Sequence, residues 1–250
     1  MELTLTATLL VCSVFFVVAA LYSSVGHGGA SGYLAVLSLF AVAQKEMSTT
    51  ALILNIVVAS IAFVFYIRAG HFSWKLTSPF LFSSIPLAFI GGLLDVSTTS
   101  YTILLAAALL FASYRLIIHI EAKEKAFQTS PSLMITLFAG GVIGLVSGIV
   151  GVGGGIFLSP LILLAGWATA KQTSATSAFF IVVNSIAGLL GRHLEGNFVI
   201  GNFLPFLLAA ILGGVVGSQL GATKFSSLFL RRLLGVVLII AAIKLILTSR

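Results

Sequence analysis

Long apolar stretches separated by short polar segments dominate the chain. A helix that crosses a bilayer needs roughly 20 apolar residues, because the hydrocarbon core is about 30 Å thick and a helix rises about 1.5 Å per residue. Stretches of that length are found at residues 4–25, 49–67, 77–95, 100–120, 132–151, 173–192, 199–220 and 227–247. The pattern therefore predicts an all-α polytopic membrane protein with about eight long transmembrane helices.

Two shorter apolar pieces, residues 30–43 and 156–167, each follow a glycine-rich break. At roughly 12–14 residues, these pieces are too short for an ordinary span. We expect two half-helices or re-entrant segments, since irregular backbone at membrane depth is tolerated where protein surrounds it.

Composition agrees with a lipid-facing exterior. Only 8% of the 250 residues are charged and 59% are hydrophobic, whereas soluble domains carry about 25% charged residues. The net charge of +7 comes from basic residues scattered at the ends of apolar stretches, which is typical of membrane orientation and argues against nucleic-acid binding. The single cysteine, Cys12, excludes an internal disulfide and a cysteine metal cluster.

The chain repeats itself at a constant shift of 125 residues. The segment 25–29 (VGHGG) matches 150–154 (VGVGG), and 56–62 (IVVASIA) matches 181–187 (IVVNSIA). Two ordered matches at a shift of half the chain length indicate a duplication. We therefore predict two homologous halves, a first transmembrane repeat at 1–125 and a second at 126–250. Duplicated halves with broken helices are a common plan of secondary transporters.

The orientation of the halves depends on the short pieces. If each short piece crosses the membrane, each half has five crossings and the halves are inverted; lysines and arginines then divide nine to four between the two sides. If each piece continues its helix, the halves are parallel and the division is eight to five. The first division favours inverted repeats without excluding the second.

Acidic residues are missing from the apolar stretches. Glutamates and aspartates lie in loops or at span ends, at Glu2, Glu46, Asp95, Glu121, Glu124 and Glu195. Cation carriers and carboxylate-based proton relays usually keep a carboxylate within the membrane. Hydrolytic enzymes need paired carboxylates or an oriented triad. We therefore expect an anionic substrate, no catalytic residues, no metal and no cofactor.

The two glycine-rich breaks are the candidate substrate site. Glycine lets a ligand approach the backbone, and a helix that restarts after a break presents free N–H groups and a positive dipole end, which favour an anion. The predicted lining residues of these breaks are Gly26, His27, Gly28, Gly29, Gly151, Val152, Gly153, Gly154 and Gly155. The alternative is helix packing, which is our interpretation of two other series with a spacing of four, Gly140, Gly144 and Gly148, and Gly213, Gly217 and Gly221.

His27 is the ionisable residue within the glycine breaks, and Val152 stands at the matching position. A histidine can bind an anion when protonated, or pass on a proton. The alternative is a neutral histidine that is hydrogen-bonded in a packed interior. Protons are therefore a candidate coupling ion.

Polar side chains also mark the helix after each short piece. They either hydrogen-bond across helices or coordinate the substrate. We predict as substrate-lining Thr49, Asn55, Ser174, Thr176 and Asn184.

A family resemblance rests on these same residues. The run Gly151–Gly155 followed by Pro160, then Ala175-Thr176-Ser177, and a weaker copy of this pattern in the first half resemble the sulfite exporter TauE/SafE family of membrane permeases. The resemblance runs through both halves. It implies export or uptake of sulfite, sulfonates or related small sulfur-containing anions in a bacterial or archaeal cell (inner) membrane.

The sequence thus predicts a multi-pass permease that moves a small oxyanion by alternating access. An anion channel is the alternative of the same class, and a membrane enzyme or assembly subunit is a third hypothesis. The expected partners are the anionic substrate, the lipid bilayer and, as coupling ion, protons; the sequence does not fix the oligomeric state.

Overall fold

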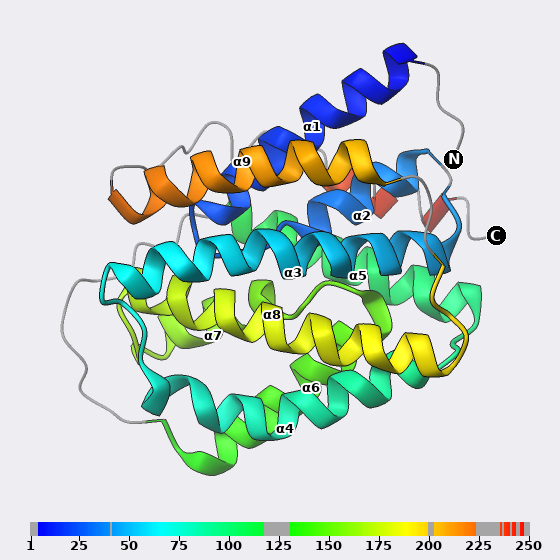
Figure 1. Cartoon of the computed structure of the whole chain (residues 1–250). Coiled ribbons are helices and arrows are strands. Elements are labelled where there is room, and N and C mark those ends of the chain that lie inside the picture. The colour runs from blue at the N-terminus through cyan, green and yellow to red at the C-terminus, as the bar shows by residue number, and fades with distance from the viewer. Residues whose placement is uncertain are drawn as a thin grey trace.

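The computed structural model describes residues 5–40, 42–117, 131–199 and 203–223, together with residues 236, 238–240, 242, 243, 246 and 247. The described part is a layered bundle of α-helices (Figure 1). The helices up to residue 117 are α1 (Leu5–Ser23), α2 (Ala30–Leu39), α3 (Gln44–Arg68), α4 (Trp74–Leu93) and α5 (Thr98–Ile117). Those after residue 130 are α6 (Leu133–Val150), α7 (Gly155–Leu164), α8 (Ala170–Leu194) and α9 (Leu204–Thr223).

The predicted all-α class is confirmed, because no strand is found among the described residues. Five of the described helices, α3, α4, α6, α8 and α9, are long and apolar enough to cross a membrane. The apolar parts of α1 and α5 fall below that length, and the count of eight long spans stays a prediction. Helices α2 and α7, at 10 residues each, have the half-helix length that was expected. Most of the predicted span 227–247 lies outside the described residues.

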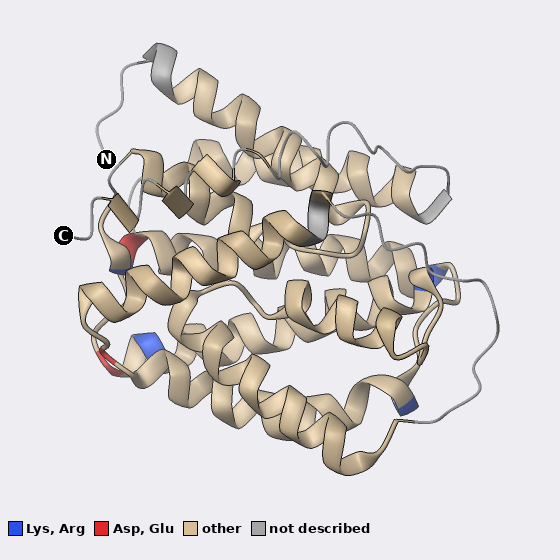
Figure 2. Cartoon of the chain, turned by 180° about the vertical axis from the view of Figure 1, so that it is seen from behind, with Lys and Arg blue, Asp and Glu red and all other residues tan. Residues whose placement is uncertain are grey.

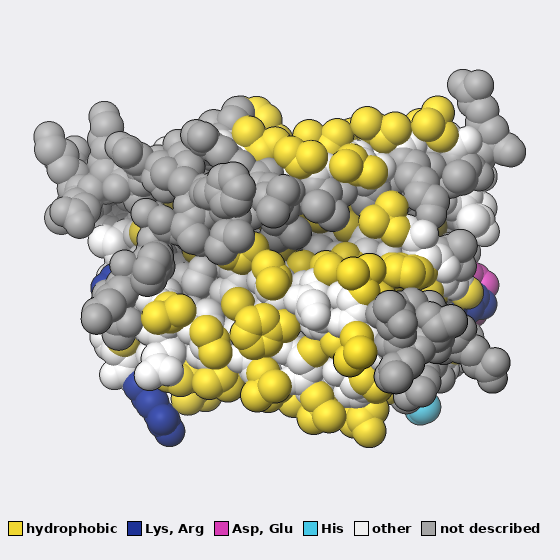
Figure 3. Space-filling model, turned by 90° about the horizontal axis from the view of Figure 1, so that it is seen from above, with side chains coloured by type: hydrophobic (Ala, Val, Ile, Leu, Met, Phe, Trp, Pro, Cys, Tyr) yellow, Lys and Arg dark blue, Asp and Glu magenta, His cyan; other side chains and the backbone are white. Residues whose placement is uncertain are grey.

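Charge is confined to the two ends of the bundle. Figure 2 shows the described lysines, arginines, aspartates and glutamates near the ends of the helices, with none of them along the middle. Hydrophobic side chains cover much of the described surface in Figure 3. Large apolar side chains such as Phe82, Met134 and Phe138 are at least 75% exposed, which is unfavourable in water and ordinary in lipid.

The two predicted glycine stripes are confirmed as packing faces. A Cβ on Gly140, Gly144 or Gly148 of α6 would overlap the backbone of α4. A Cβ on Gly213 or Gly217 of α9 would overlap the backbone of α1, and one on Gly221 would overlap that of Ser24, the residue after α1. In both pairs the residue numbers rise together along the contact, so the two helices run parallel. Small residues let helix backbones approach closely where lipid offers no hydrophobic drive to association.

Helices from the two sides of the chain thus combine into two groups. One group packs α1, α2 and α3 with α9, and the other packs α6, α7 and α8 with α4 (Figure 1). The groups meet along α3 and α8. Thr49 at the start of α3 donates a hydrogen bond to Asn197 O, beyond the end of α8, so these central helices run antiparallel.

A contact at the opposite end of the α3–α8 pair also indicates that the two helices are antiparallel. Partial burial, and then the positive charge of Lys171 at the start of α8, lower the pKa of His71 in the loop after α3. The end that holds Arg68, Lys75 and Lys171 is therefore opposite the end that holds Lys45 and Arg192.

Helices before and after residues 118–130 match in order and in length. Helices α2 and α7 have 10 residues each, α3 and α8 have 25 each, and α4 and α9 have 20 each. The boundary predicted between residues 125 and 126 lies outside the described residues. Membrane proteins with duplicated halves and broken helices often consist of repeats related by a two-fold axis.

Candidate functional site

Glycines with left-handed backbone torsions end one helix and begin the next at both breaks. Gly26 (φ 74°) follows α1, and Gly151 (φ 88°) follows α6. Gly29 (φ 95°) and Gly154 (φ 79°) immediately precede α2 and α7. An L-residue with a side chain is disfavoured at these torsions, which explains why glycine is repeated at each turn. We call residues 24–29 glycine loop 1 and residues 151–154 glycine loop 2.

The two loops meet in the interior of the bundle. His27 of loop 1 places Nε2 3.2 Å from Gly155 O and 2.9 Å from the hydroxyl of Ser159, both on α7. Its Nδ1 lies 2.9 Å from Val25 O. The Ser159 hydroxyl is also 2.8 Å from that of Ser177 on α8. His27 is therefore hydrogen-bonded in the interior, which both roles considered for it allow, and its partners across the bundle are the first residue of α7 and Ser159 one turn later.

Asn55 of α3 lies between the loops. Its Oδ1 accepts a hydrogen bond of 3.1 Å from the N–H of Ala30, the first residue of α2. A Cβ on Gly28 would overlap Oδ1, and a Cβ on Gly153 would come within 2.6 Å of Nδ2. Because Oδ1 is committed to loop 1, the amide turns its two N–H donors toward loop 2.

Several buried donors around loop 2 have no acceptor in the described part of the chain. They are Asn55 Nδ2, Ser147 Oγ and Ser185 Oγ, all on residues that are 0% exposed. A Cβ on Gly153 would lie 2.9 Å from Ser185 Oγ. A buried donor without a partner is costly, by about 1–3 kcal/mol, so a cluster of them requires an explanation.

Side chains cap the carbonyl ends of α1 and α6, which would otherwise lack partners. Tyr66 donates a 2.9 Å hydrogen bond to Ser24 O at the end of α1. Ser48 and Tyr101 both contact Val150 O at the end of α6. The guanidinium of Arg192 donates to the two preceding carbonyls of α6, those of Gly148 and Ile149.

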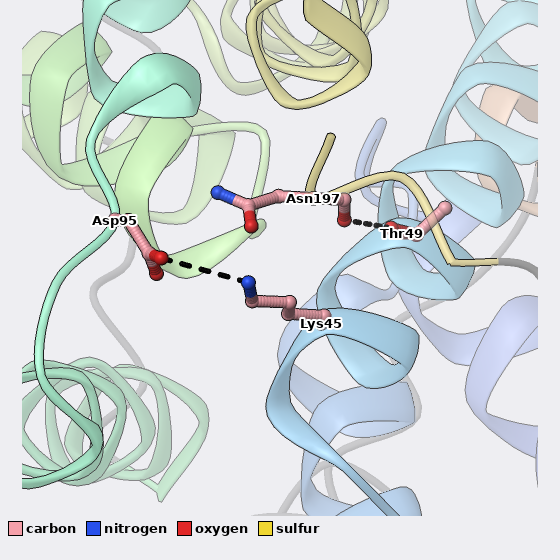
Figure 4. Close-up of polar contacts among 4 residues, drawn as sticks. All are labelled: Lys45, Thr49, Asp95 and Asn197. Carbon is pink, nitrogen blue, oxygen red and sulfur yellow. Dashed lines mark hydrogen bonds and ion pairs between the residues drawn. The ribbon is translucent and has the colours of Figure 1, made fainter. Parts of the chain in front are cut away.

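Two of the other predicted lining residues, Thr49 and Thr176, make hydrogen bonds to neighbouring segments. Thr49 donates to Asn197 O at the end of the bundle that holds the Lys45–Asp95 ion pair (Figure 4). Thr176 is 3.1 Å from the hydroxyl of Thr77 on α4. Both hydroxyls are therefore engaged in contacts between segments, the alternative role considered for this set.

Ser174 and Asn184 remain beside or within the interior. The backbone of Ser174 leaves no room for a Cβ on Gly26. Asn184 donates to Phe180 O, one turn earlier in α8, and its Oδ1 has no donor among the described residues.

Sequence reasoning missed Ser159, Ser185 and Arg192. The two serines are single hydroxyls in apolar stretches, and their contacts become visible only once α7 and α8 are packed. Arg192 was counted only among the basic residues at the ends of apolar stretches, yet it is buried, at 5% exposed. A signal did exist: Arg192 is five residues before Asn197, as Tyr66 is before His71, in the repeated segments GNF (196–198) and GHF (70–72).

Comparisons with known proteins identify the family of the chain. Residues 11–245 match the model of the family described as sulfite exporter TauE/SafE. The chain belongs to this family. It is 36% identical over 236 residues, 93% of this chain and 95% of the relative, to a probable membrane transporter protein y4hK of Sinorhizobium fredii. No solved structure matches the chain.

Two further relatives match over part of their length. A probable membrane transporter protein of Xylella fastidiosa is 33% identical over 38% of this chain and 36% of its own length. The probable membrane transporter protein YunE of Bacillus subtilis is 29% identical over 50% of this chain and 44% of its own. This TauE/SafE member is accordingly a multi-pass membrane transporter of a small molecule and not an enzyme.

Proposed function

We propose that this TauE/SafE member moves a small sulfur-containing oxyanion, such as sulfite or a sulfonate, by alternating access between two inverted halves. Glycine loops 1 and 2 form the central site, with Asn55 between them. The predicted lining glycines and His27 belong to this site. The observation that carries the proposal is the set of buried donors without acceptors around Gly153 and Gly154.

The chemistry of that cluster suits an anion. The amide N–H groups of Asn55 and the hydroxyls of Ser147 and Ser185 are donors, and helix α7 begins beside them at Gly155 with free N–H groups and a positive dipole end. Hydrogen bonds to a charged group contribute about 1.5–3 kcal/mol each. A few such bonds offset much of the cost of removing a small oxyanion from water.

The arrangement of helices supports motion of one group against the other. Helices α1 and α9 pack as a pair, and α6 and α4 pack as the corresponding pair. The antiparallel contact of α3 with α8 passes between the groups, and the loops lie next to it. Rocking along this contact would expose the site first at the Lys45 end and then at the Lys75 end.

Proton coupling through His27 fits the hydrogen bonds around it. When His27 is neutral with Nδ1–H donating to Val25 O, the Ser159 hydroxyl donates to Nε2. When both nitrogens carry protons, Nε2–H donates to Gly155 O or to the Ser159 hydroxyl, and that hydroxyl then donates to Gly155 O or Ser177 in place of His27. Tyr22 is the titratable neighbour in ring contact with His27, and its hydroxyl pairs with Ser31. Protonation would thus change the link between loop 1 and α7.

An isosteric change of Asn55 tests the site. Asn55→Asp keeps an acceptor for the N–H of Ala30 and replaces the donors facing Gly153 with a negatively charged oxygen. We expect saturable sulfite uptake into proteoliposomes to fall by at least tenfold, because repulsion replaces hydrogen bonding. Counterflow, with no conductance above carrier turnover, would distinguish the carrier from a channel.

The matched control is Ser84→Ala, which removes a buried hydroxyl without a partner on the α4 face that packs against Gly144. Uptake by this variant should equal that of the wild type. If a panel of sulfite, sulfonates and thiosulfate neither binds to nor is moved by the wild type, the substrate proposal is wrong. If Asn55→Asp transports normally, the central site lies elsewhere.

A further inference from the structure

Arg192 is a buried cation that its contacts only partly satisfy. It lies near the end of α8 and is 5% exposed. Its Nη2 donates to Gly148 O at 3.0 Å and also to Ile149 O. Its Nε–H has no acceptor in the described part of the chain. A guanidinium has five N–H donors in a planar fork, so capacity for a ligand remains.

The charge of Arg192 lacks a paired carboxylate among the described residues. Asp95 is close enough to interact electrostatically with Arg192. That aspartate is 3.5 Å from Lys45 Nζ, in the ion pair drawn in Figure 4. The carbonyl end of α6 supplies roughly half of a negative charge through the helix dipole. A buried arginine with so little compensation is unfavourable in a membrane protein and by default indicates a functional site.

Capping alone does not require this charge. At the other end of the bundle, Tyr66 of α3 caps the carbonyl of Ser24 with a neutral hydroxyl. Tyr66 and Arg192 hold matching places: each precedes by four residues a glycine with positive φ, Gly70 or Gly196. A neutral side chain therefore caps the helix end in the first half. The positive charge of Arg192 is not needed for capping and requires another explanation.

We propose that Arg192 forms an additional binding site for a small oxyanion, at the Lys45 end of the bundle and outside the glycine loops. This inference rests on the proposed function and gives its anion a first binding position. The planar guanidinium binds oxyanions through its N–H donors, and its Nε–H is a buried donor that remains unused. The carbonyls that hold Arg192 directly precede Gly151, so an anion here lies beside the chain that leads into glycine loop 2.

Binding of sodium sulfite to the purified full chain in detergent, measured by calorimetry, tests the site. We expect Arg192→Gln to weaken sulfite binding at least tenfold. Arg192→Lys, which keeps the charge and loses the fork, should fall between this variant and the wild type. Ser84→Ala, which changes a hydroxyl on the α4 face that packs against Gly144, should leave sulfite affinity unchanged.

A second variant separates binding from folding. Arg192→Tyr introduces the side chain that caps α1 in the first half, so it should stay folded by thermal unfolding while binding sulfite as weakly as Arg192→Gln. If either folded variant binds sulfite with wild-type affinity, the Arg192 site is excluded, and the central site survives provided that Asn55→Asp still loses uptake. If wild-type protein neither binds nor moves any anion of the panel, both the proposed function and the Arg192 site are wrong.

Discussion

The two glycine loops share a backbone and differ in what surrounds it. Both follow a helix through a glycine with positive φ and begin a ten-residue helix after a second one. Loop 1 carries His27 and is capped by the neutral Tyr66, whereas loop 2 carries Val152 and is preceded by carbonyls that Arg192 caps. The duplicated backbone provides the turn and the helix start, and the substituted side chains assign a different chemistry to each copy.

The largest expected contrast concerns the direction of the two copies. Ala69 and Glu195 are exposed caps at the ends of the matching helices α3 and α8. In a Cys12→Ser background, Ala69→Cys and Glu195→Cys should react with an impermeant maleimide from opposite sides of the membrane, because inverted halves place their matching loops on opposite sides. Labelling from the same side would show that the halves are parallel.

A difference in stability should separate the matching glycines at the loop starts. Gly26→Ala and Gly151→Ala both place a Cβ at a left-handed residue, at a cost of about 1–2 kcal/mol. Gly26→Ala would also overlap the backbone of Ser174, whereas at Gly151 the nearest atom is 3.1 Å away. Overpacking typically adds about 1–3 kcal/mol, so the Gly26 variant should have the lower thermal midpoint. Equal midpoints would mean that loop 1 can move away from α8.

The histidine of loop 1 should make transport depend on pH. Sulfite uptake by a His27→Asn variant should lose its dependence on pH between about 5 and 8, the range in which histidine titrates. His193→Asn, which changes an exposed histidine at the end of α8, serves as the control and should keep that dependence. An unchanged pH profile in the His27 variant would remove proton coupling from the mechanism of loop 1.

The smallest effect is expected for Asp95 and Lys45, the charged residues near Arg192, on the affinity for sulfite. Asp95 acts electrostatically on Arg192 and competes with an incoming anion. Asp95→Asn should therefore tighten sulfite binding about two- to fivefold at low salt, with a smaller gain at high salt because exposed charges are screened. Lys45→Gln, which leaves Asp95 without its ion-pair partner, should weaken binding instead. Tightening in both variants would exclude this electrostatic explanation.

Much of the fold could be predicted from hydropathy and the repeat. The predicted spans 132–151 and 173–192 agree closely with α6 and α8, and both half-helices begin within one residue of the expected position. The glycine series were correctly interpreted as packing faces because a spacing of four residues places glycines on one helix face.

The site was predictable where backbone geometry decides it and much less where side-chain direction does. The glycines that turn the backbone were candidates because the repeat singles them out, and Asn55 was a candidate because it lies on the helix after the first short piece. The position of Asn55 between the two loops was not predicted. Thr49 and Thr176 were candidates by composition, but the rotation of α3 and α8 directs their hydroxyls to Asn197 and Thr77. Arg192 was not predicted as a site residue, because its burial depends on contacts with Gly148 and Ile149, 44 and 43 positions earlier in the chain.

The pairing of α1 with α9 and of α4 with α6 has a consequence for biosynthesis. The glycine-bearing helices that pack against α1 and α4, which are α9 and α6, come later in the chain. Helices α1 and α4 are therefore synthesised before their packing partners. Neither half alone completes these contacts. Under the predicted duplication, an ancestral single unit could complete both pairs only by associating with a second copy of itself, and gene fusion would have joined two subunits that already depended on each other.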